Sequence, residues 1–276
     1  MTDDSLTACF AARMGALLGP DFPRSIGLAV SGGGDSMAML ALAHDWARPM
    51  GVGLQVVTVD HGLRDASVAE AAMVAGECAA LGHPHSTLTW AWDGQGNLQD
   101  AARRARRDQI GSWAIERGLS HVLFAHTRDD QAETVLMRLA RGSGVEGVAA
   151  MAPATTVRRT DGSAWHLLRP LLDVARTELR HHADTLHVPY VDDPSNDDPR
   201  FDRVRTRAAL EHLSDLGITP EGLARTAHRM GRARVALAAR AADIADRIQI
   251  AEPRITGHVL LDRDGFAPVE RDTQLR

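Results

Sequence analysis

The stretch Ile26–Ser36 reads Ile-Gly-Leu-Ala-Val-Ser-Gly-Gly-Gly-Asp-Ser, and it decides the fold class of the chain. A short apolar run ends in a Ser/Gly-rich turn, and apolar residues then recur with helical spacing over Met37–Trp46. This order predicts a strand, a loop and a helix at the start of an α/β domain. Glycines let the backbone approach a ligand, and amides at a helix N-terminus favour an anion. The stretch therefore predicts a phosphate-binding loop.

The alternative is a glycine-rich turn that Ser36 caps and that binds no ligand. The position of the loop, directly between a strand and a helix, favours the phosphate-binding interpretation. The loop is not a Walker A motif, because no Lys follows the glycines and the chain contains no Lys. All 31 basic residues are Arg, whose guanidinium suits bidentate contacts to phosphate.

Polar segments follow two further predicted strands, 54–59 and 121–125. The first segment is Asp60-His61-Gly62-Leu63-Arg64, and the second begins His126-Thr127-Arg128-Asp129-Asp130-Gln131-Ala132-Glu133. Ligand-binding residues of open parallel sheets gather at the carboxyl ends of strands. We therefore expect His61, Arg64 and His126 to lie near the phosphate-binding loop.

Asp130 and Glu133 lie three residues apart, on one face of a predicted helix. Two carboxylates in this position suit Mg²⁺, which prefers oxygen ligands and often shares them with nucleotide phosphates. The alternative is that acidic residues in a first helical turn only complement the macrodipole. That alternative does not account for His126 or for the strand-end position, so the pattern favours a metal site.

Two clusters of arginine offer surfaces for phosphate. The first lies on a predicted helix running from an Asn97 N-cap to about Arg117, and the second follows a polar loop over 191–199. Their members are Arg103, Arg104, Arg106 and Arg107, and then Arg200, Arg203, Arg205 and Arg207. Such clusters are usually solvated faces, but this density also fits contact with nucleic acid.

Composition limits the class of protein. The chain has 276 residues, 44% hydrophobic and 24% charged, which is ordinary for a globular protein. A net charge of −5 argues against non-specific coating of nucleic acid. Two distant cysteines, Cys9 and Cys78, indicate buried thiols in a reducing compartment. Without a signal peptide or a bilayer-spanning apolar run, the sequence predicts a cytoplasmic protein with no membrane partner.

The predicted architecture is an α/β fold with a doubly wound parallel sheet, followed by a small, mainly helical C-terminal appendage. A small hairpin is expected over 155–168, and a helix over 175–186. Composition changes near Gly217, so we expect a catalytic domain over 1–216 and a small domain over 217–276. The second domain is Ala- and Arg-rich and looks shortened.

Several segments together resemble the PP-loop ATP pyrophosphatases, and within them the tRNA(Ile)-lysidine synthases. Residues 31–36 resemble the SGGxDS signature, residues 60–64 match DHGLR, and residues 129–134 match DDQxET. Further matches are Arg141-Gly142-Ser143-Gly144, Arg169-Pro170-Leu171-Leu172 with Arg176, and Asp193-Pro194-Ser195-Asn196. The matches run in family order over about residues 26–207.

The resemblance implies the adenine nucleotide alpha-hydrolase-like PP-loop fold, ATP and Mg²⁺ as cofactors, and lysine ligation to a cytidine of the CAU-anticodon tRNA(Ile). A homodimer is a candidate assembly. Implied catalytic residues are Asp35, Arg103, His126, Asp130 and Glu133, of which Asp35, Asp130 and Glu133 would hold the metal. Implied ATP-binding residues are Ser31, Gly32, Gly33, Gly34, Asp35, Ser36 and His61. Implied tRNA-binding residues are Arg64, Arg106, Arg141, Arg203, Arg205 and Arg207.

The chain departs from the family pattern at three positions. Thr127 stands where a second His is frequent, Arg107 replaces a Tyr, and Val204 replaces an Asn. These departures concern contacts to RNA and substrate rather than the ATP chemistry.

Two rival functions are a tRNA thiolase and a non-catalytic ATP-binding module. Thiolases often use paired cysteines, and neither Cys9 nor Cys78 is so placed. A regulatory module would not need the carboxylate pair Asp130 and Glu133.

Overall fold

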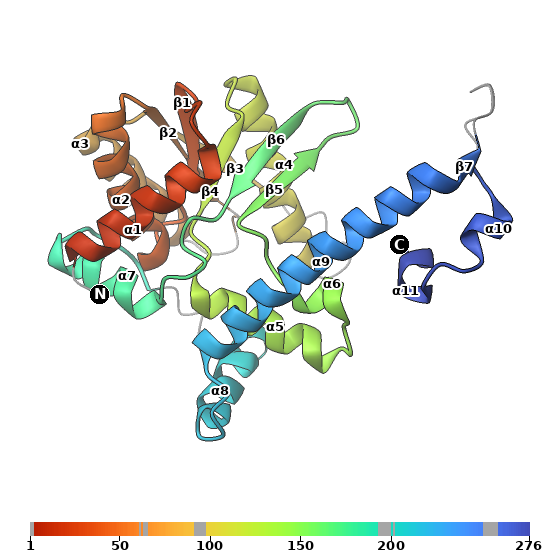
Figure 1. Ribbon diagram of the computed structural model, residues 1–276. Helices are drawn as coiled ribbons and strands as arrows, with labels where there is room; N and C mark the ends of the chain where they lie inside the picture. The colour runs from red at the N-terminus through yellow and green to blue at the C-terminus, as the bar shows by residue number, and fades with distance from the viewer. Residues whose placement is uncertain are drawn as a thin grey trace. The chain divides into compact units, whose positions relative to one another are not determined.

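The computed structural model describes residues 3–60, 62, 66–90, 98–192, 200, 202–250 and 259–276 (Figure 1). The predicted site residues His61 and Arg64, the predicted cap Asn97 and the segment 193–196 lie outside these residues. The helices are α1 (Asp3–Leu18), α2 (Gly34–Met50), α3 (Ala66–Leu81), α4 (Leu98–Glu116), α5 (Arg128–Ala140), α6 (Val145–Val148), α7 (Arg176–Thr185), α8 (Asp202–Ser214), α9 (Pro220–Ile248), α10 (Arg263–Phe266) and α11 (Arg271–Gln274). The strands are β1 (Ser25–Ala29), β2 (Gly53–Asp60), β3 (His85–Thr89), β4 (His121–Phe124), β5 (Ala154–Arg158), β6 (Ala164–Leu168), β7 (Gln249–Ile250) and β8 (Leu260–Leu261).

Six strands form one sheet in the order β3-β2-β1-β4-β6-β5. All neighbouring pairs are parallel except β5 and β6, which form the predicted antiparallel hairpin. The chain crosses from β1 to β2 to β3 in one direction and then returns to β4 on the other side of β1. This reversal is the mark of a doubly wound sheet, and it confirms the predicted α/β fold.

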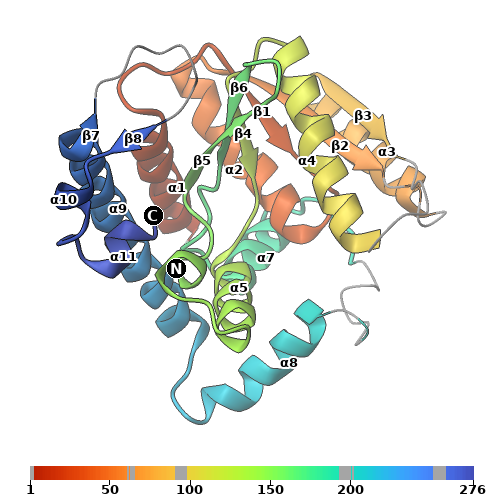
Figure 2. The same ribbon diagram turned by 90° about the vertical axis from the view of Figure 1, so that its right-hand side faces the viewer.

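Alternating side chains of the strands build a core on each face of the sheet. Ile26 and Leu28 of β1 face a layer made by α1, α2, α3 and α7, where Phe10, Met37 and Leu179 are fully buried. Ala29 of β1 faces the other layer, in which α4 contributes Ile110 and Trp113. Figure 2 shows α2 and α4 on opposite sides of the central strands. The near-continuous apolar strands follow from this burial on both faces.

The structure differs from the predicted elements in two places. Helix α2 begins at Gly34, three residues before the predicted apolar run, because Gly34, Asp35 and Ser36 form its first turn and Gly33 is its N-cap. Residues Asp202–Ser214 form helix α8, although the sequence indicated only a basic cluster there. The polar loop before α8 and the spacing of its arginines hid the weak apolar pattern. Cys78 is buried as expected, whereas Cys9 is only partly buried.

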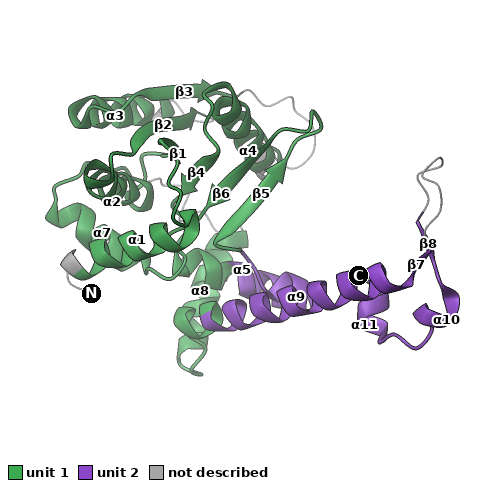
Figure 3. Cartoon of the chain, turned by 45° about the horizontal axis from the view of Figure 1, so that its top comes forward, with its two compact units in different colours: residues 1–133, 152–224 green, residues 134–151, 225–276 purple. Residues whose placement is uncertain are grey.

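The chain divides into two compact units, coloured separately in Figure 3. Unit 1 comprises residues 1–133 and 152–224 and contains the whole six-stranded sheet. Unit 2 comprises residues 134–151 and 225–276. Unit 2 contains most of the long helix α9, the short β7–β8 ladder and α10, which Asp262 caps through Gly265 N–H (2.7 Å). The predicted division at residue 216 stays a prediction.

Within the described ranges, no helix has both the length and the apolar character required to cross a bilayer.

The packing of α4 on the sheet predicts opposite effects for two Gly→Ala substitutions in helices. A Cβ at Gly111 would lie 2.5 Å from Nε1 of Trp165, whose side chain is fully buried and cannot move aside. Overpacking of this kind costs about 1–3 kcal/mol, so Gly111→Ala should lower the free energy of unfolding.

The matched control is Gly76→Ala in α3, where a Cβ meets nothing within 4 Å. This change should raise the free energy of unfolding by up to about 1 kcal/mol, because Ala favours helix over Gly. Urea denaturation of both variants measures the difference. Equal effects would contradict the described packing of Trp165 on α4.

Candidate active site

The two segments predicted to carry the chemistry leave the sheet from adjacent strands. β1 and β4 pair in parallel, with Ala29 opposite Phe124. The phosphate-binding loop follows β1, and the acidic segment follows β4. The order of the sheet reverses between β1 and β4, so the connections after these two strands lead toward opposite edges of the sheet. Ligands of open α/β sheets bind in the crevice at such a reversal point.

The loop over residues 31–36 is held by its two serines. Ser36 Oγ donates to Gly33 O (2.9 Å) and accepts from Ser31 N–H (3.1 Å). Gly32 has a φ of +88°, a conformation that a residue with a Cβ rarely adopts. Ser36 N–H donates to Gly33 O (3.0 Å), so the amides between the two serines are the candidates for contact with phosphate. They lie at the N-terminus of α2, where the macrodipole favours an anion.

Thr127 directly precedes helix α5 and fixes the orientation of Asp130. Asp130 Oδ2 accepts from Thr127 N–H (2.8 Å) and from Thr127 Oγ1 (3.0 Å), and Asp130 N–H donates to Thr127 Oγ1 (3.3 Å). This reciprocal pattern is a capping box with Asp in the third helical position. Oδ1 of Asp130 takes no part in this capping box and accepts from Arg176 Nη2 (3.2 Å). The threonine that departs from the family pattern therefore has a structural role.

Arg176, the first residue of α7, lies among the three carboxylates that were predicted to hold a metal. Its Nε is 3.1 Å from Asp35 Oδ2, its Nη2 is 3.2 Å from Asp130 Oδ1, and its Nη1 is 3.7 Å from Glu133 Oε1. Its backbone N–H donates to Asp129 Oδ2 (2.8 Å). The loop after β1 and the helix after β4 are thus joined through one guanidinium.

The charges in this cluster shift the pKa of each member. Burial raises the pKa of Asp35 to about 6, although Arg176 opposes the shift. Burial and the neighbouring Asp130 also raise the pKa of Glu133. Burial alone would raise the pKa of Asp130, but Arg176 and other neighbouring cations outweigh it and hold that pKa below its usual value. Asp130 is therefore the carboxylate that stays ionised most readily.

Two arginines predicted to contact tRNA also reach this cluster from α8. Arg207 Nη2 lies 3.1 Å from Glu133 Oε1, and Arg203 Nη1 lies 3.7 Å from Asp130 Oδ1. Helix α8 therefore packs its basic side against the acidic segment. Their role in binding tRNA stays a prediction.

His126 is partly buried at the carboxyl end of β4, and its ring stacks on Phe124 with the centroids 6.0 Å apart. Its buried Nδ1 has no hydrogen-bond partner among the residues that the structure describes. Burial lowers the pKa of His126 to about 3, so the ring is neutral at physiological pH. A neutral imidazole can position a ligand but does not supply positive charge.

Four further predicted site residues lie on α4, on α8 and just after α5. Arg103 is exposed on α4, and Arg106 is partly buried on the same helix. Arg205 is exposed and pairs with Asp202 on α8. Arg141 is exposed just after α5 and belongs to unit 2. Their predicted roles stay predictions.

Arg176, Arg169 and Asp129 belong to sequence motifs, but the sequence predicts no role for any of them. The signal was present as the spacing Arg169-Pro170-Leu171-Leu172…Arg176. This motif contains no acidic or nucleophilic residue, so the sequence does not indicate that it lies beside the predicted metal site. Only the structure shows that its second Arg meets the first loop.

The fit of the site to Mg²⁺ can be judged from its oxygen atoms. Asp35 Oδ1 and Glu133 Oε2 are buried and lack a hydrogen-bond partner among the described residues. Carboxylate oxygens in this state suit a hard cation. Over the same described ranges, no three acidic, His or Cys side chains are grouped as a ready-made metal site. The two unpartnered carboxylate oxygens therefore fit a hard cation such as Mg²⁺.

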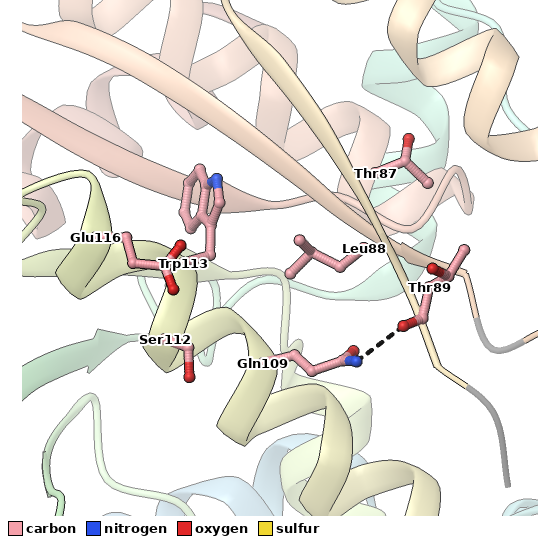
Figure 4. Close-up of a pocket in the computed structure, with 7 residues that line it drawn as sticks. All are labelled: Thr87, Leu88, Thr89, Gln109, Ser112, Trp113 and Glu116. Atoms are coloured by element: carbon pink, nitrogen blue, oxygen red, sulfur yellow. Dashed lines mark hydrogen bonds between the residues drawn. The ribbon is translucent and has the colours of Figure 1, made fainter.

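A separate pocket lies between β3 and α4 (Figure 4). Gln109 Nε2 donates to Thr89 O (2.9 Å) and bridges the helix and the strand. The lining residues are Thr87, Leu88, Thr89, Gln109, Ser112, Trp113 and Glu116. None of the predicted site residues that the structure describes lines this pocket, so it is not the candidate active site.

Comparison with known proteins agrees with this geometry. The PP-loop domain family matches residues 6–213. The fold resembles a U34-tRNA thiolase, NcsA from Methanococcus maripaludis, with a TM-score of 0.67 and 16% identity over 83% of this chain and 80% of that one. The fold and site therefore define a protein of the PP-loop class.

Curated relatives of this chain belong to one family within the PP-loop class. A tRNA(Ile)-lysidine synthase of Ruegeria pomeroyi is 51% identical over 78% of this chain and 50% of its own length. One from Methylobacterium sp. (strain 4-46) is 44% identical over 96% of this chain and 76% of its own length. The chain belongs to the tRNA(Ile)-lysidine synthase family. It spans about half the length of the Ruegeria relative.

The position of Arg176 predicts a large, pH-dependent loss of stability in Arg176→Gln. Removing one partner from a buried ionic cluster costs about 3–5 kcal/mol, because the remaining charges lose their counter-ion. The substitution also raises the pKa of the remaining carboxyl groups. The folded variant then binds more protons than the wild type, so the loss should be largest above pH 7 and should shrink as the pH falls through about 6, the pKa of Asp35.

Arg180→Gln on the same helix is the matched control. Arg180 is exposed and pairs only with the exposed Asp192 in the described part of the chain, so this change should cost less than about 1 kcal/mol. Guanidinium denaturation between pH 5 and 8 measures both variants. A pH-independent loss in Arg176→Gln would show that its charge does not matter.

Proposed function

We propose that this protein ligates L-lysine to C2 of the wobble cytidine in tRNA(Ile) with a CAU anticodon, using ATP and releasing AMP and pyrophosphate. The observation that carries the proposal is the meeting of the glycine loop and the Asp130/Glu133 pair around Arg176 at the reversal point of the sheet. Family membership supplies the substrates, through relatives that are named for this reaction.

The proposed reaction has two steps. The C2 oxygen of cytidine attacks the α-phosphorus of ATP, and pyrophosphate leaves. The ε-amine of lysine then attacks C2, loses a proton and expels AMP with the former C2 oxygen. Both steps need negative charge on phosphate to be neutralised and the reacting atoms to be aligned.

Each requirement of the reaction can be assigned to residues of the candidate active site. Amides of the loop at the N-terminus of α2 would hold the departing pyrophosphate. Arg176 keeps the three carboxylates together when no ligand is bound. The neutral His126 would orient a substrate group beside Asp130, and Arg103 remains a candidate for stabilising the adenylated intermediate. The cytidine must leave its stack to reach these groups, as bases do in enzymes that modify them.

Asp35, Asp130 and Glu133 would hold Mg²⁺, which when bound neutralises charge on the ATP phosphates. The unpartnered oxygens Asp35 Oδ1 and Glu133 Oε2 support this assignment. Mg²⁺ commonly keeps only one or two protein carboxylates and shares substrate phosphates, so a complete protein cage is not required.

The rival function of a tRNA thiolase receives no support from the cysteines. Cys78 is fully buried in α3, and burial raises the pKa of its thiol to about 12. Cys9 lies on α1, outside the candidate site. Our proposal also includes a cytoplasmic location, where tRNA, ATP and lysine are available. A homodimer stays a prediction.

Incubation with ATP, Mg²⁺, labelled lysine and individual tRNAs tests the proposal. Label should enter only tRNA(Ile) with a CAU anticodon, and AMP and pyrophosphate should form with it. Label in bulk tRNA irrespective of anticodon, or in none, would falsify the assignment.

Asp130→Asn should reduce tRNA-dependent ATP–pyrophosphate exchange by about 10²–10³-fold, because a charged group at the reacting phosphates is lost. Asp173→Asn is the control, since Asp173 is half exposed and pairs with the equally exposed Arg13 on the surface. It should retain wild-type exchange. Undiminished exchange in Asp130→Asn would favour a non-catalytic ATP-binding module.

A further inference from the structure

The pocket between β3 and α4 has no part in the function proposed above, and we refer to it as the β3–α4 pocket. Its volume is about 360 Å³, which is enough for a molecule of nucleoside size, and every residue that lines it belongs to unit 1. One wall is β3, the strand at one end of the six-stranded sheet. The other wall is a face of α4, on which Gln109, Trp113 and Glu116 follow one another at intervals of one turn.

The backbone of β3 presents hydrogen-bonding groups at the edge of the sheet. Trp90 N–H donates to Asp60 O of β2 (2.9 Å), so the backbone groups of Leu88, two residues earlier, also face β2. The backbone groups of Thr87 and Thr89 then face the opposite way, toward the edge at which the sheet ends. The strand wall of the pocket therefore offers backbone donors and acceptors that are not used in pairing with β2.

Two further polar atoms of the lining residues are buried without a partner. Gln109 Nε2 donates to Thr89 O (2.9 Å), and because a carbonyl oxygen can only accept, this bond fixes which end of the carboxamide faces the strand. The other end, Gln109 Oε1, and the indole Nε1 of Trp113 are buried and lack a hydrogen-bond partner among the described residues. One of these atoms is an acceptor and the other is a donor.

Buried polar atoms without partners are unfavourable, and a native structure that keeps them calls for an explanation. Gln109 and Trp113 stand one turn apart on α4, and both line the β3–α4 pocket. One molecule in this pocket can therefore donate to Gln109 Oε1 and accept from Trp113 Nε1.

The other lining groups restrict the chemistry of that molecule. Leu88 reaches from β3 toward α4, and the indole of Trp113 adds a flat apolar surface (Figure 4). Among the seven lining residues Glu116 alone is charged, and its carboxylate would repel a phosphate group. The unpartnered polar atoms disfavour a hydrocarbon. A flat ring with donors and acceptors on its rim satisfies both conditions, and nucleobases are such rings.

We propose that the β3–α4 pocket binds a guanine base. Guanine carries the acceptor O6 beside the donors N1–H and N2–H, which matches the donor Nε1 of Trp113 one turn from the carboxylate of Glu116. Adenine has an acceptor at N1, which would face that carboxylate, so the pocket discriminates against it. Gln109 Oε1, one turn further along α4, would accept from a ribose hydroxyl. The site does not rest on the proposed function, because none of these residues belongs to the candidate active site.

Calorimetric titration of the full chain with guanosine and with adenosine tests the proposal. A saturating non-hydrolysable ATP analogue and Mg²⁺ are present throughout, so that the candidate active site is occupied and no turnover is needed. The wild type should bind guanosine about tenfold more tightly than adenosine, and Glu116→Gln should abolish this preference by weakening guanosine alone. Trp113→Phe keeps a flat ring but loses the N–H, and it should weaken guanosine by about tenfold.

Asp108→Asn is the matched control, since Asp108 is exposed on the same helix and does not line the pocket. It should bind guanosine like the wild type. Trp113 is a core residue, so melting temperatures are measured for all variants, and the exposed Glu116→Gln decides the matter if Trp113→Phe does not fold. Absence of guanosine binding by the wild type, equal affinity for adenosine, or unchanged guanosine binding in Glu116→Gln each overturns the proposal.

Two further titrations identify the source of the base. One uses GTP, and the other uses a single-stranded RNA with unpaired guanines beside the same RNA with adenines in their place. GTP binding that Glu116→Gln weakens identifies a free nucleotide as the occupant. A preference for the guanine-containing RNA that Glu116→Gln removes identifies a base of an RNA strand. If Glu116→Gln leaves the binding of both GTP and RNA unchanged, the pocket does not hold guanine and the proposal fails.

Discussion

The guanidinium of Arg176 is the constraint on which the site depends. Asp35, Asp130 and Glu133 all face this guanidinium, from the two helices that follow β1 and β4. Like charges this close repel by several kcal/mol in a partly buried setting. A planar cation with five donors can face all three carboxylates, whereas a point charge could not match their separate directions. The guanidinium therefore stabilises three neighbouring carboxylates in the absence of a ligand.

The order of the strands determines where this site lies. Because β1 and β4 are parallel neighbours at which the strand order reverses, their carboxyl ends lie side by side, and each leads into a segment with different chemistry. The loop before α2 presents backbone amides, and the segment after β4 presents carboxylates. Asp130 of that segment contacts both Arg176 and Arg203.

Local sequence features predicted the parts of the fold and site that depend on local chemistry. The glycines of residues 32–34 indicated the loop, and the spacing of Asp130 and Glu133 indicated a shared helix face, because both depend on backbone geometry alone. Arg176 could not be placed this way, since its contacts lie up to 141 residues away along the chain. Burial of His126 and the pairing of Arg207 with Glu133 likewise depend on how α8 packs, and α8 itself was not expected as a helix.

The separation of Arg176 from Asp35 also has a consequence for biosynthesis. The loop emerges early from the ribosome, but 141 further residues must be added before its counter-ion exists. At about 5–20 residues per second this takes roughly 7–28 s. During that interval the growing chain carries Asp35, and over the last 46 residues also Asp130, without Arg176. The site of an unfinished polypeptide is therefore incomplete. Arg176 follows β6, the last strand of the sheet along the chain, so the site is completed only after all six strands have been synthesised.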